Sequence, residues 1–277
     1  MEQGSLFPTE QGTPQGGVIS PLLANIALHG METVINQQFP ARSKMTKGKR
    51  TWVAKAQLIR YADDLVILHE DQSVIEASRA IIANWLVPMG LELKPSKTRL
   101  AHTLHEVDGA AGFDFLGFTV RQFAKGKHRG GFSGKGVPLG FKTFIKPSKS
   151  SVQRHYDRLA EIVDAHRSKP QAELIDALNP VIRGWTNYHC RVVSKRIFVG
   201  LGHLLYQKLR AWGHRRHPTK AKGWTAHKYW TIIKGKGWWF ATRQGQQVMR
   251  LVRHADVPIV RHVKPGRRGG AGEPESV

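Results

Sequence analysis

The sequence predicts an α+β fold, in which a mixed N-terminal part precedes a basic helical part. Strand-like apolar runs and helical periodicity alternate up to about residue 122, whereas helical periodicity dominates from Pro147 onward. The charge changes along with this pattern. Residues 1–120 carry 11 Lys/Arg against 12 Asp/Glu, and residues 121–277 carry 32 against 8. This asymmetry indicates a near-neutral folded part followed by a part that binds a polyanion, with nucleic acid favoured over an anionic membrane surface.

The elements of the first part can be predicted in order. A Gly/Pro loop, QGTPQGGVISP, ends at Ser20 and Pro21, which predict a helix cap and a first-turn proline. Apolar residues then recur at helical spacing as far as Ile35. The later predictions are a basic loop at 40–55, an acid-bearing hairpin at 58–68, an amphipathic helix at 72–87, and short strands near 91–93, 99–102 and 113–120.

The second part begins after a glycine-rich basic stretch at 125–136, which predicts a loop or hairpin. The helical pattern covers 148–167, 171–178, 180–190 and 194–213, and the tail from Pro265 lacks apolar residues, which predicts disorder. The domain boundaries predicted from these changes are 1–122, 123–146 (a basic linker or hairpin), 147–240 and 241–277.

Composition excludes several classes of protein. Cys190 is the only cysteine, so the chain has neither a disulfide framework nor a cysteine-based zinc site. There is no secretory signal and no apolar run near 18 residues. We therefore expect a cytoplasmic protein without a membrane partner.

The segment LIRYADDLVIL, residues 58–68, places the adjacent acids Asp63 and Asp64 between two strand-like runs. A tight turn there would hold both carboxylates at one end of a rigid ribbon. Two acids held so close repel each other unless a cation neutralises them. Mg²⁺ suits such oxygen ligands, because it is usually bound by one or two carboxylates and substrate phosphates. The alternative, on these residues alone, is a solvated surface turn.

The order of motifs resolves this choice. QGTPQGGVISPLLANIAL, YADD, GLELKPSKT and FDFLGF follow one another, and LNPVIRGWTNYH comes later at 178–189. In this order they resemble motifs B, C and D and the following strand of the palm of group II intron reverse transcriptases, and then the maturase (thumb) domain. The resemblance covers residues 11 to about 240. It implies a partial polymerase palm, an antiparallel sheet with helices, followed by a helical thumb/maturase domain.

The resemblance also implies roles for residues of the YADD segment. Asp63 would bind the metal and Asp64 would be a second or supporting carboxylate, with Mg²⁺ as cofactor. Ala62, being small, would leave room for the primer end.

Residues outside YADD receive roles in the same way. Gln15 and Gly16 would border the incoming dNTP and the templating base pair. Lys97 would donate a proton to the pyrophosphate, although a solvated lysine after a turn is an equal alternative.

The family also has a fingers region and an earlier palm strand with another metal-binding aspartate, and neither has a counterpart in the ten residues before the loop. The expected activity is RNA-directed DNA polymerisation by two-metal nucleotidyl transfer, combined with intron RNA binding and splicing assistance. We expect the isolated chain to be catalytically incomplete, as the C-terminal portion of an intron protein. A homodimer or a complementing N-terminal fragment could complete it. The alternative function is an RNA-binding maturase remnant, or splicing cofactor, without polymerase activity.

The basic helical part is expected to bind intron RNA and the RNA template/DNA primer. Aromatic rings suit splayed bases, and basic side chains suit phosphates. The candidates are Arg183, Trp185, Tyr188, Arg191 and Arg196. For Trp185 a place in the core is the alternative.

Overall fold

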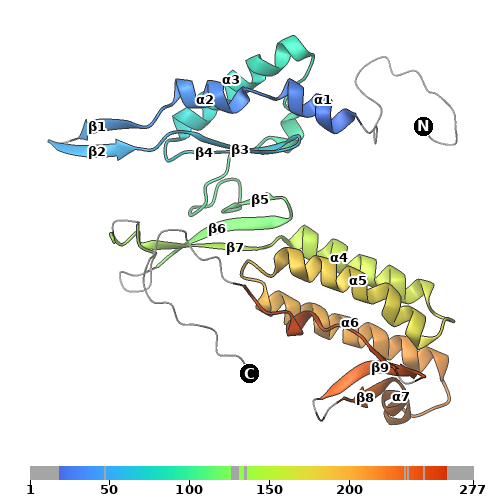
Figure 1. The fold of residues 1–277 in the computed structure, drawn as a ribbon. Helices are drawn as coiled ribbons and strands as arrows, with labels where there is room; N and C mark the ends of the chain where they lie inside the picture. The colour runs from blue at the N-terminus through green and yellow to red at the C-terminus, as the bar shows by residue number, and fades with distance from the viewer. Residues whose placement is uncertain are drawn as a thin grey trace. The chain divides into compact units, whose positions relative to one another are not determined.

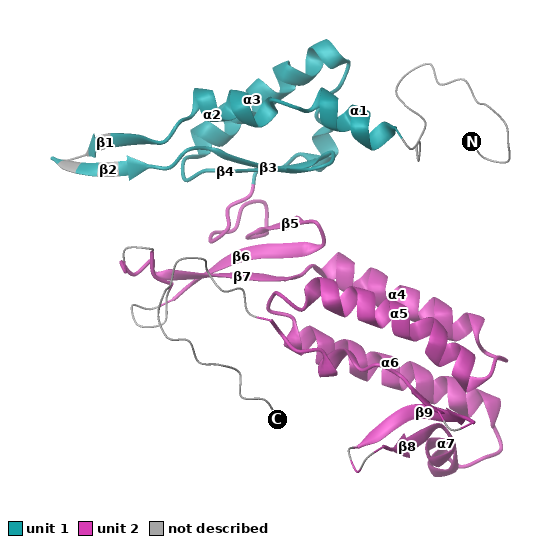
Figure 2. Cartoon of the chain, viewed as in Figure 1, with its two compact units in different colours: residues 1–100 teal, residues 101–277 magenta. Residues whose placement is uncertain are grey.

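The structure is a computed structural model that describes residues 19–260 except 47, 126–130, 134–135, 234, 236 and 246. The chain divides into two compact units, residues 1–100 and 101–277 (Figure 2). Helices and antiparallel sheets occur together, which confirms the α+β prediction. The first unit ends at residue 100, so strand β6 (Phe118–Ala124) and its partner β7 (Phe141–Pro147) both lie in the second unit.

Unit 1 is a layer of helices over short hairpins (Figure 1). Its elements are α1 (Ser20–Ala27), α2 (Met31–Gln38), β1 (Arg42–Thr46), β2 (Lys49–Val53), β3 (Gln57–Tyr61), β4 (Asp64–Leu68), α3 (Gln72–Leu86) and 3-10 turns at Val87–Met89 and Pro95–Lys97. Helices α2 and α3 bury their apolar faces against the β3–β4 hairpin, with Ile35, Leu58 and Ile82 at the centre of this core. The amphipathic helix predicted at 72–87 is confirmed, and the side chain of Asp71 caps it by accepting a hydrogen bond from the amide of Ser73.

Three local predictions for unit 1 were wrong. The helix predicted up to Ile35 is broken at Gly30, whose φ of 88° is left-handed, and Ile19 rather than Ser20 occupies the cap position. The basic loop at 40–55 is instead the antiparallel β1–β2 hairpin, whose turn contains Gly48 with φ 72°. Residues 91–93 and 99–102 do not form strands, and the segment between them instead forms the 3-10 turn that begins at Pro95.

Unit 2 combines a helical bundle with two small sheets (Figure 1). Its elements are β5 (Phe113–Phe115), β6, β7, α4 (Lys149–Ala165), α5 (Gln171–His189), α6 (Lys195–Arg216), α7 (Lys222–Tyr229), β8 (Trp230–Ile232), β9 (Trp238–Gln244), β10 (Gln247–Arg250) and a 3-10 turn at His254–Asp256. Helices α4, α5 and α6 pack around a core that includes Leu159, Leu178, Ile182 and Leu209.

Two sequence predictions for unit 2 need correction. The segment at 113–120 is not one strand but the β5–β6 hairpin, because Leu116 and Gly117 both take positive φ. The helices predicted at 171–178 and 180–190 form the single helix α5 with Pro180 inside it. Leu178 and Ile182 are fully buried on either side, so core packing keeps the helix continuous despite the missing donor. The predicted loop at 125–136 lies partly, and the tail from 265 entirely, outside the described residues.

Candidate active site and nucleic-acid interface

The carboxylates of the YADD segment lie at the turn of the β3–β4 hairpin. Tyr61 pairs with Asp64 at the end of the ladder, so Ala62 and Asp63 form a two-residue turn. Ala62 has a φ of 53°, which costs energy for a residue with a Cβ atom and is more often seen in glycine. Positive φ in a non-glycine residue is found disproportionately at functional sites.

The two carboxylates are available to a ligand. Asp63 and Asp64 are exposed, and within the described part of the chain neither carboxylate makes a hydrogen bond or an ion pair. Hard oxygen ligands with no protein partner fit a divalent cation such as Mg²⁺. The described residues contain no cluster of three or more His, Cys, Asp or Glu that could hold a metal ion. This turn therefore offers two ligands, and a cation bound here would take its other ligands from water, phosphates or other segments.

Arg60 links the turn to helix α1 by two hydrogen bonds. Its Nη1 donates to the carbonyl oxygen of Ala62 at 3.0 Å and to Oδ1 of Asn25 at 3.1 Å. Asn25 belongs to α1, the helix that follows the glycine loop, so the two motifs are in direct contact. Sequence analysis did not select Arg60 or Asn25, although Asn25 lies inside the motif that begins with the glycine loop and Arg60 directly precedes YADD.

The other site residues predicted in unit 1 are Lys97, Gln15 and Gly16. Lys97 ends the 3-10 turn Pro95–Lys97 and is exposed. Gln15 and Gly16 lie outside the described residues.

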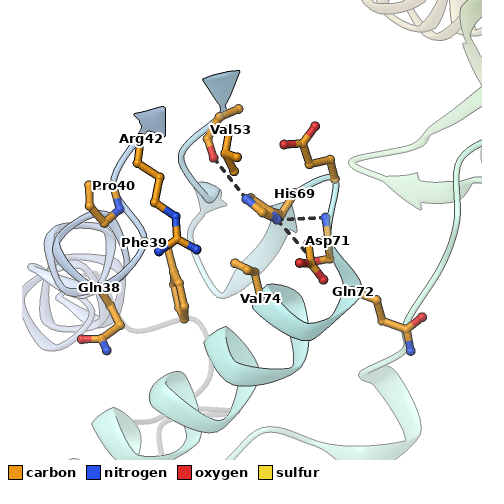
Figure 3. Close-up of a pocket in the computed structure, with 11 residues that line it drawn as sticks. Gln38, Phe39, Pro40, Arg42, Val53, His69, Asp71, Gln72 and Val74 are labelled. Atoms are coloured by element: carbon orange, nitrogen blue, oxygen red, sulfur yellow. Dashed lines mark hydrogen bonds between the residues drawn. The ribbon is translucent and has the colours of Figure 1, made fainter. Parts of the chain in front are cut away.

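A pocket of about 450 Å³ in unit 1 lies at the other end of this hairpin. His69, just after β4, lines it, whereas the Asp63 turn closes the opposite end of the ladder. Figure 3 shows His69 beside Asp71, with Arg42 on the facing wall. The His69 ring contacts the carbonyl of Ala54 at 3.1 Å, and its Nδ1 accepts from the amide of Asp71 at 3.0 Å. His69 thereby joins the β2–β3 connection to the cap of α3, which is a structural role.

In unit 2 a groove of about 500 Å³ runs between α4 and α5. Two of the predicted RNA-binding residues, Trp185 and Tyr188, line it together with Arg154 and Arg158 of α4. The sequence analysis missed these two arginines, although their four-residue spacing on the predicted helix 148–167 places them on one face. The groove thus combines aromatic surface with basic side chains, the combination that suits RNA.

The ring of Trp185 is packed within the protein as well as lining the groove. It stacks on His155 with centroids 4.4 Å apart and an interplanar angle of 8°, and its Nε1 donates to Ser151 at 3.3 Å. It also contacts His189 and Phe198. These contacts hold one ring face and the indole N–H inside the fold. Tyr188 is 54% exposed, and its hydroxyl donates to the carbonyl of Leu116 at 2.9 Å.

The predicted arginines lie apart from this groove. Arg183 is exposed on α5, two residues from Trp185, and residues at that spacing on a helix do not face the same side. Arg191 follows the end of α5, and Arg196 lies in the first turn of α6, both exposed. Arg191 and Arg196 thus flank the α5–α6 connection, whereas Arg183 lies earlier on α5.

A cluster of buried histidines adjoins the groove, and His155 and His189 belong to the groove's lining. Nε2 of His155 and Nε2 of His254 share a hydrogen bond of 2.9 Å, so one ring donates and the other accepts. His189 contacts the hydroxyl of Ser151 at 3.2 Å. Burial, together with the neighbouring rings of His254 and His189, lowers the pKa of His155 to about 3, and burial lowers the pKa of His189 and His254 to about 4. All three rings are therefore neutral at physiological pH.

Comparison with known proteins agrees with both halves of this description. Residues 1–120 match the family described as reverse transcriptase (RNA-dependent DNA polymerase). The carboxylate turn therefore lies within the part of the chain that matches this class of nucleic-acid polymerases. Residues 152–230 match the group II intron, maturase-specific domain. The chain, which carries both regions in this order, belongs to the group II intron reverse transcriptase/maturases.

A relative is found among characterised proteins. Protein YkfC of Escherichia coli (strain K12) is 27% identical over 139 residues, which cover 42% of this chain and 34% of YkfC. The match thus spans about a third of the length of that relative. Among the described residues, no helix is both long enough and apolar enough to cross a bilayer.

Proposed function

We propose that the protein takes part in RNA-directed DNA polymerisation and holds intron RNA during splicing. The observation that carries the proposal is the pair of exposed carboxylates, Asp63 and Asp64, on a rigid two-residue turn. The match of residues 1–120 to reverse transcriptases favours this function over that of a purely RNA-binding remnant.

In this proposal Asp63 and Asp64 hold Mg²⁺. When bound, the ion supplies charge stabilisation to the attacking 3′-hydroxyl and the leaving pyrophosphate. Ala62, with its single methyl group, leaves space for the end of the primer beside the carboxylates. Arg60 bonds the carbonyl of Ala62 and so helps to hold the backbone that carries the carboxylates.

Three further residues would contact the incoming nucleotide or its pyrophosphate. Gln15 and Gly16 border the incoming dNTP and the templating base. Lys97 donates a proton to the pyrophosphate. Two-metal catalysis requires carboxylates around both ions, so a further aspartate from another segment or subunit completes the shell.

The helical unit contributes RNA binding. The groove between α4 and α5 and the exposed residues Arg183, Arg191 and Arg196 provide aromatic surface and positive charge on described elements. The maturase match over residues 152–230 supports intron RNA as the ligand, with the RNA template and DNA primer held by the same unit.

The polymerase part is tested by primer extension on an RNA template in the presence of Mg²⁺. The 277-residue chain is assayed alone and together with a fragment that carries the fingers and the first palm aspartate. We expect no extension by the chain alone and extension by the pair. Asp63→Asn, which keeps the shape but removes the charge, should reduce that extension more than about 100-fold.

The control is Asp108→Asn, an exposed acid outside the candidate site, which should retain extension. Extension that tolerates Asp63→Asn would rule out the metal role of this residue. Extension by the chain alone that depends on Asp63 would show that the chain, or an oligomer of it, completes the site.

A further inference from the structure

We propose that the β1–β2 hairpin is an arm that contacts unpaired RNA, with Trp52 as the ring on which a base stacks. This inference rests on the RNA-binding part of the proposed function. It adds a contact in unit 1, whereas the predicted RNA-binding residues all lie in unit 2.

The hairpin is a separate two-stranded sheet that extends beyond the helices of unit 1 (Figure 1). Its base is fixed, because the amide of Ala56 donates to the carbonyl of Phe39 at 3.2 Å, and Ala56 is fully buried. Two-stranded hairpins are only marginally stable by themselves. The attachment at Ala56 therefore supports this hairpin at one end, while Trp52 and Met45 on its strands are exposed to solvent.

The register places four side chains on one face. Ser43 pairs with Trp52, and Met45 pairs with Arg50; since these positions are two apart along each strand, they share one side of the ribbon. Nη2 of Arg50 donates to the hydroxyl of Ser43 at 3.2 Å, which holds the guanidinium along this face. The face therefore presents an indole, a guanidinium and a thioether.

Trp52 is the most exposed tryptophan of the chain, with 69% of its surface accessible. Met45 on the same face is 66% exposed. Elsewhere, Trp224 has Lys220 and Lys228 near its ring. Within the described part of the chain, no cation or aromatic ring contacts the Trp52 ring, and its exposed surface can receive a planar group.

The charge of the segment selects the partner. Between residues 42 and 55 lie six of the eleven Lys and Arg residues of the first 120, and this segment contains no Asp or Glu. Unit 1 is otherwise acidic, so its positive charge is concentrated in this segment, and Arg50 shares the face of Trp52. An exposed aromatic ring in a basic segment suits single-stranded nucleic acid, because bases stack on the ring while nearby cations neutralise phosphates. If Trp52 were only a structural residue of the core, its ring would be buried and the segment would not need its basic side chains.

The test measures binding of the full-length chain to a fluorescent oligoadenylate of about 12 nucleotides, by anisotropy at several salt concentrations. Trp52→Ala should raise the Kd by about 5- to 100-fold, whereas Trp52→Phe, which keeps an aromatic ring, should stay within about threefold of wild type. Neither substitution should change the salt dependence, since stacking releases no ions. Arg50→Ala should instead flatten the slope of log Kd against log salt by up to about one.

Trp238→Ala is the matched control, because Trp238 is also exposed, at 46%, but lies on β9 of unit 2. We expect it to bind within about threefold of wild type. Thermal melting should be unchanged within about 2 °C in Trp52→Ala, because the ring makes few contacts. Vesicles of anionic phospholipid are the second ligand, and we expect Trp52→Ala not to change their binding.

Unchanged oligoadenylate binding by Trp52→Ala would overturn the inference while leaving RNA binding by unit 2 intact. An equal loss in Trp238→Ala, a lower melting temperature in Trp52→Ala, or a loss of vesicle binding alone would also overturn it. A wild-type chain that binds no RNA would instead contradict the proposed function itself.

Discussion

Arg60 and Asn25 join two motifs that lie 35 residues apart in the sequence. The guanidinium of Arg60 bonds both to the Asn25 side chain in α1 and to the carbonyl of Ala62 in the carboxylate turn. These two hydrogen bonds tie α1 to the turn that carries Asp63. One side chain thus links the helix that follows the glycine loop to the turn that carries the two carboxylates.

Asn25→Ala should loosen this turn. A hydrogen bond from a charged donor at an exposed site contributes about 1 kcal/mol, so amide exchange at residues 61–64 should become about fivefold faster. Hydrogen exchange followed by mass spectrometry measures this change. Gln37→Ala, an exposed residue of α2, is the control and should leave these amides unaffected. Equal protection in Asn25→Ala would mean that the contact does not hold the turn.

Ala62→Gly should stabilise unit 1. The positive φ of Ala62 costs about 1 kcal/mol for a residue with a Cβ atom, and glycine avoids most of this cost. Ala62→Val should be destabilising, because a β-branched side chain tolerates positive φ poorly. Urea unfolding followed by a probe in unit 1 gives both values. If glycine and valine are equivalent, the backbone at this turn is not strained.

The buried histidines should make unit 2 sensitive to acid. Their pKa values of about 3 for His155 and about 4 for His189 and His254 lie below the ordinary value of 6.5. Between pH 6.5 and 4 the unfolded chain therefore binds more protons than the folded chain. Stability is fully present above pH 6.5 and is lost as the pH falls through this window, by up to about 1.4 kcal/mol per pH unit for each histidine.

Thermal unfolding between pH 4 and pH 7.5 measures this dependence. His155→Phe keeps an aromatic ring on Trp185 but removes one titrating group, so it should reduce the slope by up to one proton. His203→Phe, which replaces an exposed histidine of α6, should keep the wild-type slope. A wild-type stability that is flat across this range would contradict the assignment of neutral buried rings.

Substitution of the three predicted RNA-binding arginines and substitution of Trp185 should have different effects. Replacing Arg183, Arg191 and Arg196 by alanine should flatten the salt dependence of RNA affinity, by about one unit of slope for each lost phosphate contact. Filter binding over a salt titration measures this slope. Arg243→Ala, on β9, tests whether the effect is confined to these three arginines.

Trp185→Ala should mainly destabilise the fold. Its ring packs on His155, His189 and Phe198, and removal of a packed tryptophan costs about 3 kcal/mol or more. Its melting temperature should therefore fall clearly. If it melts like wild type but binds RNA more weakly, the predicted stacking of Trp185 on a base is the better explanation.

The sequence by itself determined the features that local patterns encode. Two apolar runs around adjacent acids predicted the β3–β4 hairpin with Asp63 and Asp64 at its turn, and helical periodicity predicted α3, α4 and α6 to within a few residues. The motif order identified the family. These predictions succeed because the apolar periodicity of a segment reports which of its own faces is buried.

Only the tertiary structure decided which faces meet. Arg154 reaches the groove of Trp185 because α4 packs on α5, and His155 bonds His254 across 99 residues. The β1–β2 hairpin was missed because its strands carry lysines and arginines in place of an alternating apolar pattern. Backbone pairing and the left-handed Gly48 form that hairpin, whereas contacts between distant segments depend on packing that no local pattern contains.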